Sequence, residues 1–543
     1  MRTAVLQGPL GKAIELSVEK RFKVLDFALL EQPFKDRNET DNAWRCEFWG
    51  KVIRPVITAA AVSKDQTLLD LLEKTVKAMM ATQTPDGCIS SYPAEKQLDG
   101  WDVWGRKYVL LTLLRYYEFI KPDPAILECC CRVMDHFIAQ AQLEENPAAV
   151  LNCGRHNGLA ASSILGAAVN LYRLTRNEKY RRLALGIIDS GCSLLGNIFE
   201  DTLAGILPSS LGNGKAYEMT SCFQGAAELE LLEHDPKRLA AIKKYYAAVR
   251  EREIFVTGAG GAKDQVGEFW YDGALRQTRP GAMGLGETCV TATWIRFCAV
   301  MLELTDDCTI ADELEKSLYN GILGALAPDG SHWMHLNPTP LTGGGFKAYA
   351  PDQIEQCFKT PYGGNDCCRA QGPEGLLMAS LVAVTGKEDA VTVNLFENLT
   401  SGNLTITGNY PIENKVRIAF TGHTQKSLRL RTPEFLKRVL LNGRELPFTC
   451  GSWLVISRQW TPEDEVVMEF DFTLREIPAP DGSPFVALKR GPLLLAADSR
   501  KAVPGALVST EWNGIPLCDY ATAGNLFEKS NPLCVWFKKE KQS

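Results

Sequence analysis

The spacing of polar turns along the first two thirds of the chain constrains its fold most strongly. Turn residues occur at intervals of 59, 54, 58, 71 and 80 residues, near Lys64, Asp123, Asn177, Asp235, Asp306 and Gly386. Each turn lies between two apolar segments of helical period. Six helical hairpins that must each bury one face pack most compactly as a closed ring. The pattern therefore predicts an α/α toroid. The alternative is an open solenoid, whose intervals are usually shorter and more regular.

After Gly386 the apolar period changes from that of helices to the period of two that is typical of strands. Alternating segments follow at residues 390–395, 402–407, 415–420, 428–431, 439–443, 453–456 and 466–472. Several short strands at close spacing predict a β-sandwich. Helices first and strands second indicate an α + β chain of two domains. We expect an α/α barrel over residues 1–385 and a β-sandwich with a C-terminal extension over 386–543, where the segment after Arg500 could add strands or meet a partner subunit.

Composition excludes several classes of protein. The chain of 543 residues has 59 Lys and Arg against 65 Asp and Glu, a net charge of −6, and no basic block beyond its short tail. Nucleic acid is therefore not an expected partner. No apolar run approaches the roughly 20 residues of a spanning helix, so we expect no membrane insertion. The chain as written predicts a cytoplasmic protein, or a periplasmic one if a signal peptide has been removed. A homodimer is left open.

Seventeen cysteines is a high count without the regular spacing of a disulfide framework, so most of them are expected to be buried, reduced thiols. Two short polar clusters differ from the rest: Gly286-Glu-Thr-Cys289 and Asn365-Asp-Cys-Cys368. Their three thiols and one carboxylate are a plausible tetrahedral set for Zn²⁺. Paired cysteines also occur as core filler, which is the alternative. Cys357 lies close before the pair and could also contribute.

Zinc would keep a bound thiolate ionised, and a sulfur nucleophile can attack an acetal carbon if a nearby acid protonates the leaving oxygen. Glu268 is the candidate acid/base, because it follows the glycine-rich stretch 257–262 and precedes the Glu-x-Cys segment by 19 residues. A solvated loop glutamate is the alternative. The six histidines show no ligand spacing, so a histidine-based zinc site and a Ser/His/Asp triad have little support.

At these residues the chain resembles the cysteine-dependent β-L-arabinofuranosidases of glycoside hydrolase family 127. The resemblance rests on Glu47-Phe-Trp-Gly-Lys51, Val256-Thr-Gly-Ala-Gly-Gly261, Gly267-Glu-Phe269, Gly286-Glu-Thr-Cys289, Leu318-Tyr-Asn-Gly-Ile322, Asn337-Pro338, Cys367-Cys368 and Val486-Ala-Leu-Lys-Arg-Gly-Pro492. It implies an (α/α)6 barrel followed by β-sandwich material. It also implies that Glu287, Cys289, Cys367 and Cys368 bind zinc, that Cys367 is the nucleophile, and that Glu268 is the acid/base of a retaining double displacement.

The chain departs from the family pattern in the presumed sugar pocket. Tyr108, Ala161 and Lys215 stand where the family has sugar-binding histidines, and His335 replaces a tyrosine before Asn-Pro. Cys-Cys-Pro becomes Cys367-Cys-Arg369. The expected sugar contacts are Tyr108, Lys215, His335, Arg369, Trp270 and Arg106. Because Lys215, Arg106 and Arg369 are cations that pair well with carboxylates, the sugar could be acidic or branched; surface salt bridges are the alternative.

These observations predict an exo-acting, retaining glycoside hydrolase that releases a β-L-arabinofuranose-like or acidic sugar from pectic oligosaccharides. Two other functions remain open. One is a non-catalytic carbohydrate-binding protein with a structural zinc. The other is a different α/α-toroid enzyme, such as a sugar epimerase or an unsaturated uronide hydrolase, in which His or Asp would do the acid/base work.

Overall fold

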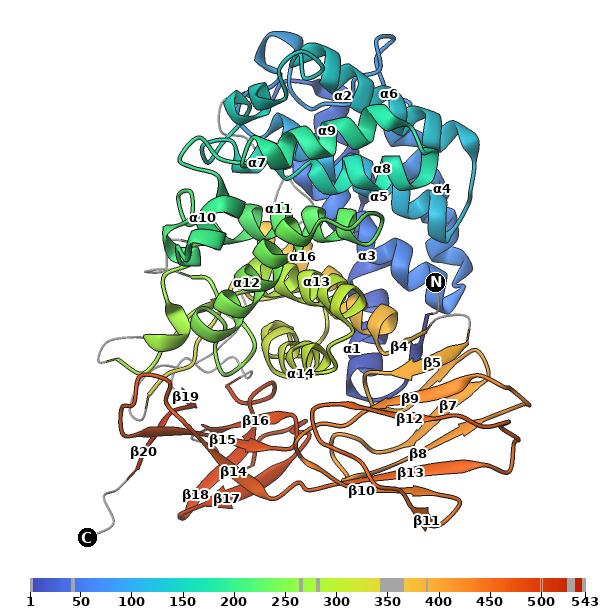
Figure 1. Ribbon diagram of the computed structural model, residues 1–543, viewed down its shortest axis with the longest axis vertical. Helices are drawn as coiled ribbons and strands as arrows, with labels where there is room; N and C mark the ends of the chain where they lie inside the picture. Colours follow the sequence, from blue (N-terminus) through green and yellow to red (C-terminus); the bar gives the residue numbers. More distant parts are fainter. Residues whose placement is uncertain are drawn as a thin grey trace.

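Six helices of the described chain form a closed ring (Figure 1). The computed structural model describes residues 3–40, 44–262, 267–279, 284–341, 366–386, 389–498, 500, 502–524 and 533–539. Each inner helix packs on the next, and the last packs on the first. In order they are α3 (Phe48–Ser63), α5 (Asp102–Phe119), α8 (Leu165–Thr175), α11 (Ala216–Glu230), α13 (Thr288–Thr305) and α16 (Cys367–Val382). The predicted toroid is confirmed and the open solenoid is excluded.

An outer helix packs on each of the first five inner helices. These outer helices are α4 (Gln66–Met80), α6 (Pro124–Gln140), α9 (Glu178–Asp189), α12 (Pro236–Arg252) and α14 (Thr309–Lys316). The predicted turns lie between the members of each pair for a local reason. Asp123, Asn177 and Asp235 are N-caps whose side chains accept hydrogen bonds from the first backbone N–H groups of their helices. Lys64 and Asp306 end α3 and α13 in the left-handed conformation.

The sixth turn, at Gly386, does not join two helices. The chain leaves α16 directly into strand β4 (Val384–Thr385), and the helix that packs on α16 is α1 (Pro9–Ser17) from the N-terminus. A further helix, α2 (Phe27–Asp36), packs on α3 and α4. The expectation of six sequential hairpins is therefore corrected, because the ring closes through the start of the chain.

Shorter helical segments connect these elements. They are α7 (Leu159–Ser162), α10 (Ile198–Ala204), η1 (Val18–Phe22), η2 (Arg45–Glu47), η3 (Ala94–Lys96), η4 (Pro147–Asn152), η5 (Pro208–Ser210), η7 (Gly273–Leu275), η8 (Ser317–Ile322) and η9 (Leu323–Ala325).

The strands gather on one side of the helical ring (Figure 1). A seven-stranded antiparallel sheet has the order β1 (Val5–Leu6), β6 (Leu399–Ser401), β7 (Leu404–Gly408), β8 (Lys415–Phe420), β13 (Glu465–Phe470), β10 (Leu436–Leu441) and β11 (Arg444–Glu445). A four-stranded sheet has the order β12 (Trp453–Ile456), β9 (Ser427–Arg431), β5 (Ala390–Val393) and β4, in which β5 and β9 are parallel. Inward residues such as Val416 on β8 and Leu428 on β9 belong to one core with the barrel.

A third sheet follows and includes most of the tail. Its order is β14 (Leu474–Pro478), β15 (Phe485–Arg490), β16 (Leu493–Asp498), β18 (Ile515–Asp519) and β17 (Ser509–Trp512), with β19 (Leu533–Cys534) on β16 and β20 (Phe537–Lys538) on β15. The residues after Arg500 thus add strands. Because β1 and β4 also lie in sheets, the β-region takes strands from both sides of the predicted boundary at 385/386.

Among the described helices, α13 is long and apolar enough to cross a membrane by length and composition. Of its 18 residues, 72% are buried inside the protein, as its place in the ring requires. Its apolar character is therefore explained by burial on both faces.

Close packing of α3 on α5 depends on Gly50. A Cβ at this position would lie 2.5 Å from Tyr108 Cβ and 2.6 Å from the Tyr108 carbonyl oxygen. We expect Gly50→Ala to lower the free energy of unfolding by about 1–3 kcal/mol, because helix α5 must shift to relieve the overlap. Thermal unfolding followed by circular dichroism measures the effect. The control is Gly422→Ala, where an added Cβ meets nothing within 4 Å; equal melting temperatures for the two variants would contradict the prediction.

Candidate functional site

The first part of the site is the start of α13. Strand β2 (Gly286–Glu287) leads directly into this helix, so Glu287 and Cys289 lie at its N-terminal end. β2 pairs with β3 (Leu336–Asn337), and the Thr288 N–H donates to the His335 carbonyl oxygen at 3.1 Å. This short ribbon fixes the extended entry to the helix, which brings Glu287 and Cys289 together although residues two apart do not share a helical face.

The second part is the start of α16, the next helix of the ring. Asp366 is its N-cap and accepts a hydrogen bond from the Arg369 N–H at 2.8 Å. Cys367 and Cys368 therefore form the first turn, where unpaired backbone N–H groups and the helix dipole favour negative charge. Because α13 and α16 are adjacent and start at the same end of the ring, residues about 80 positions apart in sequence meet.

The four predicted metal ligands come together. Single ligand atoms of Glu287, Cys289, Cys367 and Cys368 all lie within 4.8 Å of one another, and Cys368 Sγ is 3.5 Å from Glu287 Oε1. Glu287, Cys289 and Cys368 are buried, and Glu287 Oε2 has no hydrogen-bond partner among the described residues. A buried carboxylate oxygen without a donor, facing three thiols, fits a thiophilic cation such as zinc. The set is therefore a candidate metal site that is compatible with zinc.

The three thiols differ in their acidity. The pKa of Cys367 is held well below its usual range by hydrogen bonds from the thiols of Cys289 and Cys368. Burial and those same bonds raise the pKa of Cys289, and burial raises that of Cys368. Of the three, Cys367 is also the least buried. The cluster thus concentrates thiolate character on its most accessible sulfur.

Glu268 and Lys215 form a buried ion pair beside the cluster. Lys215, the residue that precedes α11, donates from Nζ to Glu268 Oε2 at 2.6 Å, and both side chains are about one-tenth exposed. Burial alone would raise the pKa of Glu268, but Lys215, Lys51 and His335 together lower it to about 2. The pKa of Lys215 is raised despite its burial, by Glu218 and Glu268. In this structure the pair therefore holds one proton on the lysine and an ionised carboxylate.

A second buried lysine–carboxylate pair lies at the start of α3, where Glu47 precedes the helix and Lys51 is in its first turn. Lys51 Nζ lies 2.9 Å from Glu47 Oε2, which also accepts from the Trp104 indole N–H at 2.6 Å. The Lys51 ammonium is 4.8 Å from the centre of the Tyr217 ring and 5.3 Å from that of Tyr108, whose hydroxyls are hydrogen-bonded to each other. Trp104, Tyr108 and Tyr217 pack in one cluster with Cys289 and Cys368. The predicted sugar contact Tyr108 therefore packs against Cys289 and Cys368 of the candidate metal site and is fully buried.

Another acidic side chain, Glu218, lies one helical turn after Lys215. It is buried, neither of its carboxylate oxygens has a hydrogen-bond partner among the described residues, and burial raises its pKa to about 7. His156 Nε2 is 4.0 Å away, and the His156 ring lies 5.4 Å from Trp101 and 6.3 Å from Phe269. Burial and the charge of Lys215 lower the pKa of His156 to about 4, so this imidazole is neutral.

Two further predicted residues lie at the cluster. His335 Nε2 is 3.3 Å from Glu287 Oε1, and its Nδ1 is 4.0 Å from Asp366 Oδ2. The neighbouring carboxylates raise the pKa of His335 against the opposing effect of burial. The Arg369 Nε is 3.5 Å from Asp366 Oδ2. Both cations therefore have carboxylate neighbours within the protein.

The structure corrects the expectation for Arg106 and Trp270. Arg106 is buried on the side of α5 that faces α6, where its guanidinium contacts Asp102, His136 and Gln140. Trp270 is in the main hydrophobic core and donates from its indole N–H to the Tyr245 hydroxyl at 2.9 Å. Neither side chain is brought to the thiol cluster. Cys357 lies outside the described residues.

Sequence reasoning missed Glu218 and His156 and gave Lys51 no role beyond its motif. Glu47 and Lys51 had a signal, since a carboxylate and a lysine four residues apart in an otherwise apolar helix predict a buried pair. Glu218 stands three residues after Lys215 and thus on the same helical face. His156 had no signal, because it lies in a short turn before α7.

Comparisons with known proteins relate the chain to a family of glycoside hydrolases. The family model described as "Beta-L-arabinofuranosidase, GH127 catalytic domain" matches residues 17–380. A non-reducing end β-L-arabinofuranosidase of Bifidobacterium longum subsp. longum is 24% identical over 310 residues, which are 53% of this chain and 46% of that relative. The match thus spans less than half the length of the relative.

Solved structures share the fold over almost the whole chain. A GH127 β-L-arabinofuranosidase from Geobacillus stearothermophilus T6 has a TM-score of 0.72 and 17% identity, covering 99% of this chain and 100% of the other. A second GH127 β-arabinofuranosidase has a TM-score of 0.73 and 17% identity, covering 99% and 97%. At this identity they show the fold, an α/α barrel with a β-rich C-terminal region.

Proposed function

Because the chain belongs to the family of the GH127 β-L-arabinofuranosidase catalytic domain, we propose that it is a retaining glycoside hydrolase with Cys367 as nucleophile and Glu268 as acid/base. The proposal extends to the release of a β-L-arabinofuranose-like sugar from pectic oligosaccharides. The observation that carries it is the meeting of Glu287, Cys289, Cys367 and Cys368 beside the Glu268–Lys215 pair.

Zinc is the proposed cofactor, held by Glu287, Cys289, Cys367 and Cys368. The donor set supports it, because thiolates favour zinc over hard cations and the free Glu287 Oε2 supplies an oxygen ligand. Bound zinc would keep the Cys367 sulfur ionised and fixed in position. The chain itself contributes to the same end through the N-terminus of α16 and the thiol hydrogen bonds to Cys367.

In the first half of the reaction, the Cys367 sulfur attacks the anomeric carbon and the bond from that carbon to the leaving oxygen breaks. The leaving oxygen takes a proton from Glu268, and a glycosyl thioether on Cys367 remains. In the second half, Glu268 accepts a proton from water, the water oxygen attacks the anomeric carbon, and the thioether bond breaks. Configuration is retained because two displacements occur at the same carbon.

Lys215 holds the proton that the first half of the reaction needs. Glu268 is ionised in the resting pair, and the proton that it must donate is held on Lys215 Nζ, 2.6 Å away. The proton moves from Lys215 Nζ to Glu268 as negative charge develops on the leaving oxygen. The pair can therefore act first as an acid and then as a base. Lys215 is thus a positioning residue for the acid/base, standing where the family has a histidine.

The internal ion pairs favour a neutral sugar over an acidic one. Lys215 is matched by Glu268 and Arg369 by Asp366, so the pairing of these cations with a sugar carboxylate would break existing pairs. The acidic-sugar hypothesis therefore loses its main support, and we propose a neutral β-L-arabinofuranose-like substrate.

Glu268→Gln tests the acid/base role. We expect kcat/KM on an unactivated arabinofuranosyl oligosaccharide to fall by about 10²–10⁴-fold, because the leaving oxygen is no longer protonated. The loss on a p-nitrophenyl arabinofuranoside should be much smaller, since that leaving group needs little protonation. Released arabinose and nitrophenolate are measured in parallel. Equal losses on both substrates would contradict the proposal. So would the absence of hydrolysis by both the wild type and the variant, a result that would favour a carbohydrate-binding protein.

The metal set is tested by Cys289→Ala, with Cys298→Ala as control because both thiols are buried in α13 and only Cys289 belongs to the cluster. We expect purified wild type and the control to carry about one zinc per chain, and Cys289→Ala to lose most of it. Inductively coupled plasma mass spectrometry measures the content. Zinc retained by Cys289→Ala, or absent from wild type after zinc supplementation, would overturn the assignment.

Lys215→Met tests the shared proton. Without the ammonium the pKa of Glu268 rises, as burial dictates, and Glu268 must hold the donated proton by itself. The alkaline limb of the kcat/KM profile on an unactivated substrate should therefore move to lower pH, because the lysine no longer retains the proton there. Lys215→Arg keeps the positive charge but does not give up its proton, so it should lower kcat/KM on this substrate without moving the limb to lower pH. An unchanged limb in Lys215→Met would show that Lys215 does not hold the proton.

A further inference from the structure

A cavity of about 810 Å³ lies inside the ring at the end opposite the thiol cluster. We call it the lower cavity. The thiol site is built from the starts of inner helices, whereas the lower cavity is lined by the middle and C-terminal parts of all six. On the side of the sheets it is bordered by Thr385, Asn394, Arg429 and Trp453. Its volume suits a small ligand, and the proposed hydrolysis does not use it.

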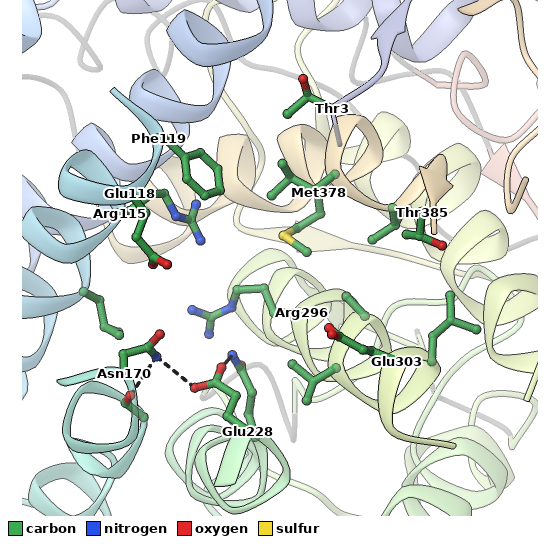
Figure 2. A pocket seen from close by; sticks show the side chains of 18 of the residues that line it. Thr3, Arg115, Glu118, Phe119, Asn170, Glu228, Arg296, Glu303, Met378 and Thr385 are labelled. Carbon is green, nitrogen blue, oxygen red and sulfur yellow. Dashed lines mark hydrogen bonds between the residues drawn. The ribbon is translucent and has the colours of Figure 1, made fainter. Parts of the chain in front are cut away.

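Each inner helix contributes a polar side chain at or beside the lower cavity. These are Arg54 from α3, Arg115 from α5, Asn170 from α8, Glu228 from α11, Arg296 from α13 and Glu374 from α16. Figure 2 shows Arg115, Asn170, Glu228 and Arg296 converging on the open space between the helices. Three guanidinium groups thus face two carboxylates. Among these six side chains the excess charge is positive. Glu118, Glu303 and Asp306 also line the cavity, and two of them have their own arginine partners, Arg173 for Glu118 and Arg429 for Asp306.

The partners of the two carboxylates leave Arg296 as the guanidinium without an ion pair among these six side chains. Glu374 is shared by Arg54 and Arg115, with nitrogen–oxygen distances of 3.0 and 2.9 Å. Glu228 is occupied by Gln224 and Asn170, whose amide nitrogens donate to it at 2.8 and 3.1 Å.

Arg296 is 95% buried, yet within the described part of the chain no carboxylate oxygen lies within 4.0 Å of it. It donates a single hydrogen bond there, to Thr293 Oγ1 at 3.3 Å, and its Nε has no acceptor.

Helix electrostatics do not account for these cations. Arginines in the last turn of a helix complement its dipole, but Arg54 and Arg296 stand in the middle of α3 and α13. A buried guanidinium without a counter-charge is costly. Burial and the neighbouring Arg115 and Arg296 lower the pKa of Arg54 to about 10 against the opposing effect of Glu374, so three guanidinium groups act on this one carboxylate.

We propose that the lower cavity binds a small polyhydroxylated oxyanion whose carboxylate or phosphate is held by Arg296 and Arg115. The planar guanidinium fork suits both groups, because two parallel N–H bonds match two oxygens of either. Asn170 and Gln224 line the same space and offer amide partners for the hydroxyls. Phe119 and Trp453 add apolar ring surface at the border of the cavity.

Direct binding tests the proposal without turnover. D-galacturonate carries the carboxylate, D-galactose 6-phosphate carries the phosphate, and D-galactose is the uncharged control; isothermal titration calorimetry on the full chain measures each. We expect at least one of the two anions to bind and galactose to bind at least about tenfold more weakly, since it lacks the charge-assisted bonds. The stronger anion identifies the source of the oxyanion. Equal binding of galactose, or binding of none of the three, overturns the proposal.

Variants place the binding in the lower cavity. Arg296→Met should weaken anion binding about 10- to 100-fold, whereas Glu228→Gln should strengthen it, because it removes the carboxylate that opposes the ligand. If Arg296→Met does not fold, Glu228→Gln still tests the site, with a change of opposite sign. Lys215→Met, at the other end of the ring, should leave anion binding unchanged. Loss of binding in Lys215→Met would assign the anion to the thiol end. No gain in Glu228→Gln would show that the anion does not bind beside Glu228. Either result would overturn the proposal.

Discussion

Closure of the helical ring between α16 and α3 is the constraint on which both ends of the barrel depend. Because the six inner helices run in one direction, their N-termini gather at one end and their C-terminal halves at the other. The starts of α13 and α16 supply the thiols and Glu287, while the residues just before α3 and α11 supply Glu47 and Lys215. A ring left open at α16 would separate Cys367 and Cys368 from the Glu47–Lys51 pair on α3.

Local signals predicted the hairpins, whereas the closure of the ring could not be predicted from them. Asp123, Asn177 and Asp235 mark turns because their side chains cap helices within three residues, and such chemistry is visible in sequence. The sixth outer helix is α1, which packs on α16 from the other end of the chain. Strand β1 likewise pairs Val5 with Thr400. No turn residue reports a contact between such distant segments, so the sequence pattern wrongly predicted a sixth local hairpin at Gly386.

Site residues in compact sequence motifs were predicted, whereas those that meet only through distant contacts were not. The thiol set was found because Glu-x-Cys and Cys-Cys are compact motifs, and the structure brings them within 4.8 Å. Arg106 was misplaced because a position two residues from Tyr108 points to the far side of α5, about 200° around the helix. Glu218 and His156 come from different segments that meet only after folding. Cationic residues near a motif in sequence are therefore weak evidence for a shared pocket.

Buried charge continues along the barrel axis between the two ends. Lys107 lies between them: its Nζ is 3.2 Å from the centre of the Trp104 ring behind the thiols, and the residue also lines the lower cavity. Burial and the charges of Arg296 and Lys51 lower the pKa of Lys107 well below its usual value, and its one hydrogen bond among the described residues is to the Ser163 hydroxyl. A lysine that readily loses its proton adds little charge between the sites. The thiol end, with its matched lysine–carboxylate pairs, and the lower cavity, with Arg296, are linked through Lys107, Tyr108 and Tyr217, on which the charges of both Lys51 and Arg296 act.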